Sequence, residues 1–277
     1  ESKENVSVDQ IIKQIGFIPN VVYSGMTDYF MNSTDLLNIY KKTSAQIYTI
    51  AVDMNHFTGG CHYAWDCKGY IKGCGIDCPA ILDQNKKTLA KQNFELKFKN
   101  ASEANFKNIG MSQWTVNQAK ESKIYKNQDK INNINSIIDT DVLNDSCREF
   151  AKKIFNLESD KFYILMGSQN VNHARKGFEY LLKALQILYA KLPENKRSKI
   201  EVLIVSRQVT DSFSEIPFNK KHIDYINDYR LLALLYQSAD VFVNSSIEDS
   251  GPMMVSEALA CGTPVVGFNM GVVSNMV

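Results

Sequence analysis

The sequence predicts an α/β protein with two domains, each built on a parallel sheet that helices cover on both faces. In the second half of the chain, short continuous apolar runs of strand length alternate with segments of helical spacing, which is typical of a doubly wound parallel sheet. Residues 132–147 are polar, lack periodicity and separate two halves with different patterns. The length of 277 residues suits about two domains. We therefore expect one domain at 1–140 and another at 141–277.

The individual elements follow from the spacing of apolar residues. In the first half, the pattern predicts buried strands at 18–24 and 47–52, with a helix at 33–42 between them. In the second half, the predicted strands are 162–167, 200–206, 240–244 and 264–268, and the predicted helices are 177–192, 230–239 and 252–260.

Composition excludes several classes of protein. The net charge of +1 gives no global field for binding nucleic acid. No run of about 18 apolar residues is present, so no membrane-spanning segment is predicted. The six cysteines are unevenly crowded, which favours a reducing compartment over a secreted disulfide scaffold. The chain starts at Glu1 without a signal pattern, and we interpret it as a fragment of a cytoplasmic protein.

One segment is strongly basic. Residues 86–130 contain ten lysines against four acids, with Phe94, Phe98 and Phe106 interleaved. A solvated surface of helix and loop explains this composition. A basic face for anionic lipid or for a phosphate-bearing acceptor explains it too, so peripheral contact with an anionic membrane stays open.

The loop after the predicted strand 240–244 has the features of an anion site. Ser250 and Gly251 supply a capping turn, and Pro252 suits the first position of the following helix. The N–H groups of the helix start at Gly251–Met253 and the helix dipole would then face the ligand. We therefore expect this loop to bind a diphosphate.

Two carboxylates flank that helix start. Asp249 lies on the loop, and Glu257 lies in the second turn of the helix. So placed, they can face one ligand at two points along its length. The alternative from spacing alone is that Asp249 caps the helix and Glu257 is an exposed helical acid.

Residues 246–268, which read SIEDSGPMMVSEALACGTPVVGF, closely resemble the donor-binding signature of glycosyltransferase family 4. That signature contains an acid, seven further residues and a glutamate, followed by an Ala-rich helix and Gly-Thr-Pro-Val-Val. The resemblance places Asp249 near the transferred sugar and Glu257 at the nucleotide ribose. Glu248 precedes the first acidic position by one residue, and the spacing favours Asp249.

A second segment is similar to the same family. Gly167 and Ser168 follow a predicted strand, and Arg175 and Lys176 precede a helix. The family holds the donor diphosphate with basic side chains here, which implies this role for Lys176. The family usually has Arg where this chain has Ser168, and Arg175 can compensate because a guanidinium pairs well with phosphate. The resemblance also implies that the base meets the backbone near Ile226.

The first half resembles a subgroup of this family that builds bacterial surface polysaccharides, including lipopolysaccharide. The matching segments are 53–63, 73–79, 112–114 and 138–141. The subgroup has a histidine, thought to line the acceptor side, where this chain has Val52. Asn55 and His56 lie close in sequence and are candidates to replace it, and His62 is a further candidate for acceptor contact.

The resemblance implies the GT-B fold, with two Rossmann-like domains facing a cleft. It implies a retaining, hexosyltransferase-type enzyme that moves a sugar from a UDP- or GDP-sugar to a saccharide or lipid-linked acceptor. No metal is needed for the transfer, since Lys176, Arg175 and the helix start stabilise the leaving diphosphate. The implied location is the cytoplasm, at the inner face of the membrane. The family's first strand and closing helices lie outside the chain, so we expect these 277 residues to bind donor without transferring sugar.

Two other functions are weighed against this one. A nicotinamide-dependent oxidoreductase would share the α/β pattern, but no G-x-G-x-x-G motif follows any predicted strand. A catalytically silent protein that binds nucleotide sugars is the stronger alternative, because Val52 and Ser168 depart from the family pattern.

Four cysteines are crowded in the first half with the spacing C-x5-C-x6-C-x3-C. They are Cys61, Cys67, Cys74 and Cys78. Tetrahedral zinc takes four such ligands, although this is not a standard zinc spacing. Small buried cysteines in a glycine-rich loop and a redox-labile pair are the alternatives, and a structural zinc ion is the one cofactor the sequence suggests.

Overall fold

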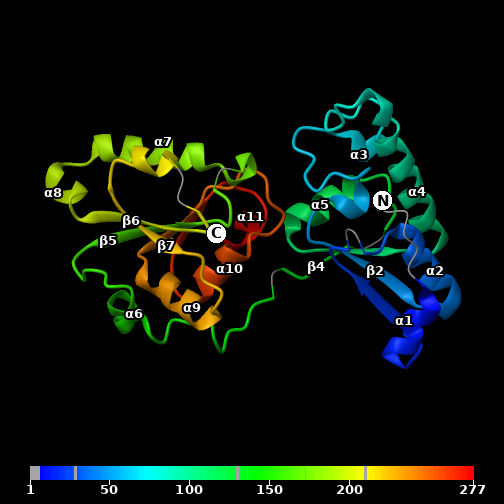
Figure 1. Cartoon of the computed structure of the whole chain (residues 1–277), viewed down its shortest axis with the longest axis horizontal. Helices are drawn as coiled ribbons and strands as arrows, with labels where there is room; N and C mark the ends of the chain where they lie inside the picture. Colours follow the sequence, from blue (N-terminus) through cyan, green and yellow to red (C-terminus); the bar gives the residue numbers. More distant parts are fainter. Residues whose placement is uncertain (1–6, 28–29, 129–130, 136, 172, 209–210) are drawn as a thin grey trace. The chain divides into compact units, whose positions relative to one another are not determined.

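The computed structural model describes most of the chain, in residues 7–27, 30–128, 131–135, 137–171, 173–208 and 211–277. The chain forms two compact units, Glu1–Asn135 and Ser136–Val277 (Figure 1). The division falls inside the polar segment 132–147, shortly before the expected boundary after residue 140. Each unit contains one parallel sheet, so the predicted α/β class is confirmed.

The sheet of the first unit has four strands in the order β1-β2-β3-β4, and all neighbours are parallel. The strands are β1 Val21–Ser24, β2 Gln46–Ala51, β3 Lys107–Gly110 and β4 Asn132–Asn133. In β2, Ile47, Thr49 and Ala51 are at most 1% exposed, because residues two apart share one face of a strand. The carboxyl ends of parallel strands meet at one edge of a sheet, and at this edge β1 continues into Gly25 and β2 into Val52.

The helices of the first unit are α1 Val8–Ile15, α2 Ser33–Thr43, η1 Asn55–Phe57, α3 Gly69–Lys72, η2 Gln84–Lys86, α4 Leu89–Glu103 and α5 Gln113–Glu121. A capping box fixes the start of α2: the N–H of Asp35 donates to Asn32 Oδ1 at 3.1 Å, and the N–H of Asn32 donates to Asp35 Oδ2 at 2.9 Å. Helix α2 thus begins at Ser33 because the Asn32 side chain accepts hydrogen bonds from the first free N–H groups of the helix.

Helix α4 departs at Lys97 from the expectation of a solvated basic surface. Its buried residues include Phe94 and Ala101, but also Lys97 and Asn100, and Lys97 is only 7% exposed. Other lysines of the helix, such as Lys99, are exposed. The last residues of the basic segment, 129 and 130, lie outside the described residues.

The strand expected at 18–24 begins only at Val21. Ile18 is 65% exposed, and Pro19 has no N–H to donate to a neighbouring strand. The apolar run is therefore longer than the strand, and its first part lies on the surface.

The sheet of the second unit has five strands in the order β7-β6-β5-β8-β9, again all parallel. The strands are β5 Phe162–Gly167, β6 Ile200–Ser206, β7 Asn219–Asp224, β8 Val241–Asn244 and β9 Val265–Gly267. The chain builds outward from β5 through β6 to β7 and then returns to place β8 on the other side of β5. The order thus reverses between β5 and β8, and ligands of such sheets bind beyond the carboxyl ends of the strands at this switch point.

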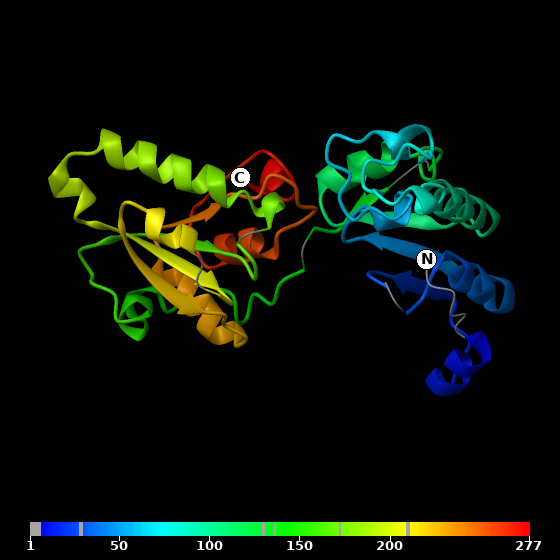
Figure 2. The same ribbon diagram turned by 45° about the horizontal axis from the view of Figure 1, so that its top comes forward.

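Helices cover both faces of this sheet (Figures 1 and 2). They are α6 Arg148–Ile154, η3 Ala174–Lys176, α7 Phe178–Lys191, α8 Glu194–Arg197, η4 Asp211–Glu215, α9 Tyr229–Ser238, α10 Met253–Ala260 and α11 Val273–Met276. Tyr163 and Leu165 of β5 pack in one core cluster with residues of α9 and α10. Ile164 and Met166 pack in another cluster with residues of α7. Successive residues of β5 therefore pack into cores on opposite faces of the sheet, which confirms the doubly wound sheet.

Strand β7 was not predicted from the sequence. It reads NKKHID, lies at the edge of the sheet, and has no fully buried residue. An edge strand needs no continuous apolar run, so its pattern resembles that of a loop. Among the described residues, no helix is both long enough and apolar enough to cross a membrane.

Candidate functional site

A cavity of about 750 Å³ lies at the switch point of the second unit, beyond the carboxyl ends of β5 and β8. Eleven residues were predicted for catalysis or donor binding, and nine of them line this cavity. The nine are Gly167, Ser168, Arg175, Lys176, Ile226, Asp249, Pro252, Met253 and Glu257. Ser250 and Gly251 are not among the lining residues. The structure therefore brings together segments that are up to 90 residues apart, since the set spans 167 to 257.

One carboxylate in this cavity faces two cations. Arg175 Nη1 and Lys176 Nζ each lie 2.6 Å from Asp249 Oδ2. The Asp249 side chain is 10% exposed, and the two basic side chains are 21% and 23% exposed. Charged hydrogen bonds at this distance and burial are strong, so Asp249 pairs with both cations. Glu248, the neighbouring acid, does not line the cavity.

Backbone contacts hold the two cations against the loop that carries Asp249. The Ile247 N–H donates to the Arg175 carbonyl at 2.8 Å, and Ser245 Oγ donates to the Lys176 carbonyl at 2.8 Å. Gly177 follows with φ of +60°, and a Cβ there would lie 2.1 Å from the Ser245 carbonyl oxygen. Only glycine allows this approach, which explains why a glycine follows Lys176 in the sequence.

Glu257 is a buried acid with one defined partner, which rules out the exposed helical acid considered from spacing. It is 5% exposed, and the hydroxyl of Tyr236 donates to its Oε2 at 2.7 Å. Burial raises the pKa of Glu257, and the Tyr236 hydrogen bond opposes that shift. Burial, followed by the charge of Glu257, raises the pKa of Tyr236 well above its ordinary value. The Tyr236 hydroxyl therefore stays a neutral hydrogen-bond donor to the Glu257 carboxyl at neutral pH.

The start of α10 differs slightly from the prediction. Pro252 has ψ of 107° and caps the helix, so the first helical residue is Met253. Pro252, the N-cap residue, makes no side-chain capping hydrogen bond. The chain is held there by a close approach at Gly271, where a Cβ would lie 2.7 Å from the Asp249 carbonyl oxygen.

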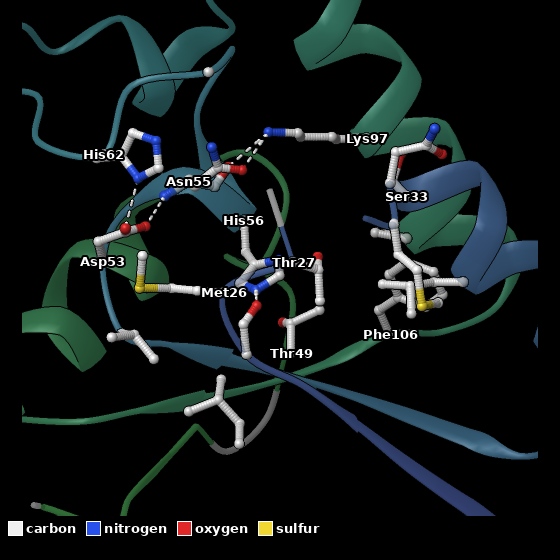
Figure 3. Close-up of a pocket in the computed structure, with 18 of the residues that line it drawn as sticks. Met26, Thr27, Ser33, Thr49, Asp53, Asn55, His56, His62, Lys97 and Phe106 are labelled. Carbon is white, nitrogen blue, oxygen red and sulfur yellow. Dashed lines mark hydrogen bonds and ion pairs between the residues drawn. The ribbon is translucent and has the colours of Figure 1, made fainter. Parts of the chain in front are cut away.

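The first unit has a cavity of its own, of about 850 Å³, at the carboxyl ends of β1 and β2 (Figure 3). A row of hydrogen bonds follows one wall. Lys97 Nζ donates to the carbonyl and to Oδ1 of Asn55 at 2.8 and 3.0 Å. The Asn55 N–H donates to Asp53 Oδ1 at 2.8 Å, and His62 Nδ1 donates to Asp53 Oδ2 at 2.6 Å. His56 lines the same cavity, and its Nε2 donates to the Gly25 carbonyl at 2.8 Å.

These contacts distinguish His62, the candidate for acceptor contact, from Asn55 and His56, the two candidates to replace the family histidine at Val52. Asn55 accepts a hydrogen bond from Lys97, and the His56 ring forms a hydrogen bond with the Gly25 carbonyl. His62 is the one bonded to a buried carboxylate, that of Asp53. The sequence named His62 for acceptor contact but did not favour it, because the eight residues between it and Asp53 hide the pairing.

The four crowded cysteines also lie close together. Burial, followed by the neighbouring Cys78, Cys74 and Cys67 thiols, raises the pKa of Cys61 to about 11. The Gly59 N–H donates to Cys74 Sγ at 3.2 Å. Within the described residues, however, no three His, Cys, Asp or Glu side chains are arranged as a set of metal ligands.

Sequence reasoning missed several polar residues of the second-unit cavity, among them Tyr236, Asn170 and His173. Tyr236 sits in an apolar helix pattern in which a tyrosine is an ordinary core residue. Asn170 and His173 lie on a loop without periodicity. No signal in the residues alone distinguishes these three from structural positions.

Two parallel α/β units, one of them with a paired-cation cavity at its switch point, define the GT-B class of glycosyltransferase folds. The fold is shared by sucrose-phosphate synthase from Thermosynechococcus elongatus, with a TM-score of 0.61 and 15% identity over 95% of this chain and 59% of that chain. It is shared as well by Anabaena HepE in complex with UDP-glucose, with a TM-score of 0.60 and 12% identity over 98% of this chain and 65% of that chain.

Residues 148–277, nearly all of the second unit, match the model for glycosyl transferases group 1, so this unit is similar to that family. An uncharacterized glycosyltransferase of Haemophilus influenzae is 28% identical over 160 residues, which are 54% of this chain and 39% of the relative. The match thus spans about two fifths of that relative's length.

Proposed function

We propose that this protein is a retaining glycosyltransferase that moves a hexosyl group from a nucleotide sugar to a saccharide or lipid-linked acceptor. The observation that carries the proposal is the second-unit cavity, where Arg175, Lys176, Asp249 and Glu257 converge at the topological switch point. The match of residues 148–277 to the group 1 family model supports the transferase class. HepE, which shares the fold, binds UDP-glucose, and this supports a UDP-sugar as the first donor to test, with GDP-sugars next.

In this proposal the two cations stabilise the leaving diphosphate. The bond between the sugar C1 and the diphosphate oxygen breaks, and the acceptor oxygen bonds C1 on the same face. The acceptor proton leaves with the nucleoside diphosphate. Arg175 and Lys176 stabilise the negative charge that develops on the diphosphate. Phosphate oxygens compete with Asp249 for these cations, so donor binding releases the Asp249 carboxylate to face the sugar.

Glu257 has the complementary role at the nucleotide. Its buried carboxylate is held by Tyr236 and lines the cavity. A carboxylate so held accepts hydrogen bonds from the two ribose hydroxyls, as the family resemblance implies. The donor base would meet the backbone near Ile226, which lines the same cavity.

The first experiment is a thermal-shift screen of the 277-residue chain with nucleoside diphosphates. A ligand that binds the folded state raises the melting temperature by mass action. UDP or GDP should raise it, and the Lys176→Met variant should lose the response. No response to any nucleoside diphosphate would contradict the donor site.

A catalytically silent nucleotide-sugar-binding protein is the second candidate. Ser168 stands where the family usually has Arg, and its Oγ donates to the Asn170 carbonyl at 3.2 Å. Val52 stands where the subgroup has a histidine. Assays of sugar transfer and of donor hydrolysis on the protein at its natural length separate the two candidates: binding with neither reaction would establish the silent protein.

We also propose that the protein is cytoplasmic and contacts the inner face of an anionic membrane through its first unit. Leu82, Leu89 and Leu96 are 88%, 43% and 38% exposed, next to the exposed Lys86 and Lys91. Such a mixture of cations and apolar side chains binds anionic bilayers in a salt-dependent way. The protein should co-sediment with phosphatidylglycerol vesicles but not with phosphatidylcholine vesicles. Absence of binding to both kinds of vesicle would overturn the proposal.

A structural zinc ion at Cys61, Cys67, Cys74 and Cys78 remains a proposal. The closeness of the four thiols supports it. As placed, the side chains do not form a ligand set, so binding would require their rotation. Protein purified without added zinc should contain about one zinc ion per chain, and Cys74→Ser should lower its stability. Folded protein without metal would leave packing as the role of these cysteines.

A further inference from the structure

The cavity of the first unit differs from the donor cavity in how its charges are satisfied. Its two buried ionised groups, Asp53 and Lys97, are 5% and 7% exposed and opposite in sign. Asn55 links them, since it accepts from Lys97 and donates to Asp53. The network therefore holds balanced charge within the wall, and the cavity offers no excess of cations for a phosphate group.

The rest of the lining suits a neutral, hydroxyl-rich molecule. Thr27 and Asn93 supply hydroxyl and amide groups, while Leu36, Met31 and Phe106 supply apolar surface. Its volume of about 850 Å³ lies in the range of small-molecule sites. Sugars combine hydroxyl edges with apolar C–H faces, and such a mixed lining matches both.

His62 lines this cavity, and a buried neighbour fixes the orientation of its ring. Asp53 accepts through both oxygens, from the Asn55 N–H and from His62 Nδ1, so a buried carboxylate fixes the orientation of the imidazole. With Nδ1 bonded to Asp53, Nε2 is the ring nitrogen through which His62 would bond a ligand. The carboxylate is 7% exposed and the imidazole is 42% exposed, so the buried partner orients a ring that ligands can reach (Figure 3).

We propose that His62, oriented by Asp53, accepts a hydrogen bond from a hydroxyl group of a neutral saccharide bound in the first-unit cavity. The inference rests on the proposed glycosyltransferase function, for which this saccharide is the acceptor. Asp53 is then a positioning residue that selects the tautomer, and His62 is the group that touches the ligand.

The four histidines of the chain allow a direct test by NMR. His56 and His62 line the first-unit cavity, and His173 lines the donor cavity. His222 lines neither cavity and bonds Ser206, so it is the internal control. The Cε1–H signals of the intact 277-residue chain are assigned with four single His→Gln variants, and methyl glycosides of glucose, galactose, mannose, rhamnose and N-acetylglucosamine are titrated as probes.

At least one glycoside should shift the His62 signal saturably while His173 and His222 stay still. His62→Gln should weaken its binding about 3- to 12-fold, as expected for one hydrogen bond, and His222→Gln should leave binding unchanged. Asp53→Asn should weaken binding and change the 15N shifts that report the His62 tautomer, which a merely structural role would not do.

The two cavities make failure of the inference distinguishable from failure of the proposed function. If UDP-glucose or GDP-mannose shifts His173 but no glycoside shifts His62, the inference is overturned and the donor site stands. If neither class of probe shifts any signal, both are overturned. The wild-type titration alone decides these outcomes, so a variant that fails to fold does not block the test.

Discussion

In the second unit, a single carboxylate, Asp249, holds two cations that come from a different segment of the chain. In the first unit, Lys97 and Asp53 both bond Asn55, so one asparagine links the two opposite charges, and Asp53 bonds His62 as well. The first arrangement has an excess positive charge that an incoming anion can take over. The second is balanced and already hydrogen-bonded. The difference indicates that the balance of charges lining a cavity predicts its ligand better than the number of those charges does.

The largest effect should come from Asp249→Asn. The variant keeps the shape of the loop but removes the carboxylate that faces the sugar, and we expect transfer by the protein at its natural length to fall by about 10²–10³-fold, as when one catalytic charge or dipole is lost. The same change leaves Arg175 and Lys176 without their internal anion. Nucleoside diphosphate affinity, measured by calorimetry, should therefore hold or rise. A matching loss of affinity would show that Asp249 builds the site rather than serving the chemistry.

Glu257→Gln should act on the nucleotide instead. We expect it to weaken nucleoside diphosphate binding by about 1.5–3 kcal/mol, the range for a hydrogen bond to a charged group. The matched control is Glu179→Gln on α7, an exposed acid outside the cavity. Equal affinities for wild type and Glu257→Gln would remove the ribose contact from the proposal.

The Lys97→Met variant tests the hydrogen-bonded charge network of the first unit. It leaves the carbonyl and Oδ1 of Asn55 without this donor, so we expect the free energy of unfolding to fall by about 1–3 kcal/mol. Both tryptophans, Trp65 and Trp114, lie in the first unit, so denaturant unfolding followed by tryptophan fluorescence reports this unit. Lys99→Met, two residues along the same helix, is the control.

In the Lys97→Met variant, nucleoside diphosphate affinity should stay at the wild-type value. A fall in affinity would mean that the two cavities are coupled, and the comparison between them would have to be redrawn. Unchanged stability would show that the buried lysine is dispensable to the network of the first unit.

The smallest effect is a pH dependence carried by Glu257. Burial raises the pKa of this carboxyl above its ordinary value of 4.5, so it takes up a proton at a higher pH than an exposed glutamate does. Nucleotide affinity should therefore fall as the pH drops through this raised value, by less than about tenfold, or 1.4 kcal/mol. The folded state also binds this proton more tightly than the unfolded state. The group's contribution to stability is therefore greatest below the ordinary pKa and is lost as pH rises through the raised one. Glu257→Gln should show neither dependence.

Sequence reasoning succeeded where burial on both faces leaves a continuous apolar run. The predicted strands 162–167 and 200–206 match β5 and β6 to the residue. It failed for β7, whose edge position allows a polar sequence, and for α4, whose core face contains Lys97 and Asn100.

The candidate site was predictable only in part, for a related reason. Asp249 and Lys176 were expected near one ligand because both matched a family signature. Nothing in the residues predicts their direct ion pair, because a contact between positions 73 apart depends on how the sheet is assembled. The pairing of His62 with Asp53 and of Tyr236 with Glu257 depends on tertiary structure in the same way.

The polar edge strand β7 has a consequence for how the molecule behaves in a crowded solution. An edge strand with open hydrogen-bonding groups invites a strand from a second molecule, and natural proteins discourage this with charged side chains, lysine above all. Strand β7 carries Lys220 and Lys221 in sequence, and Lys221 is further tied to the carbonyl of Phe155 at 2.6 Å. Strand β1 of the first unit, also an edge, instead exposes Val21 and Tyr23, at 43% and 64%. Aggregation during refolding should therefore begin at the sheet of the first unit, and a lysine at position 21 or 23 should suppress it.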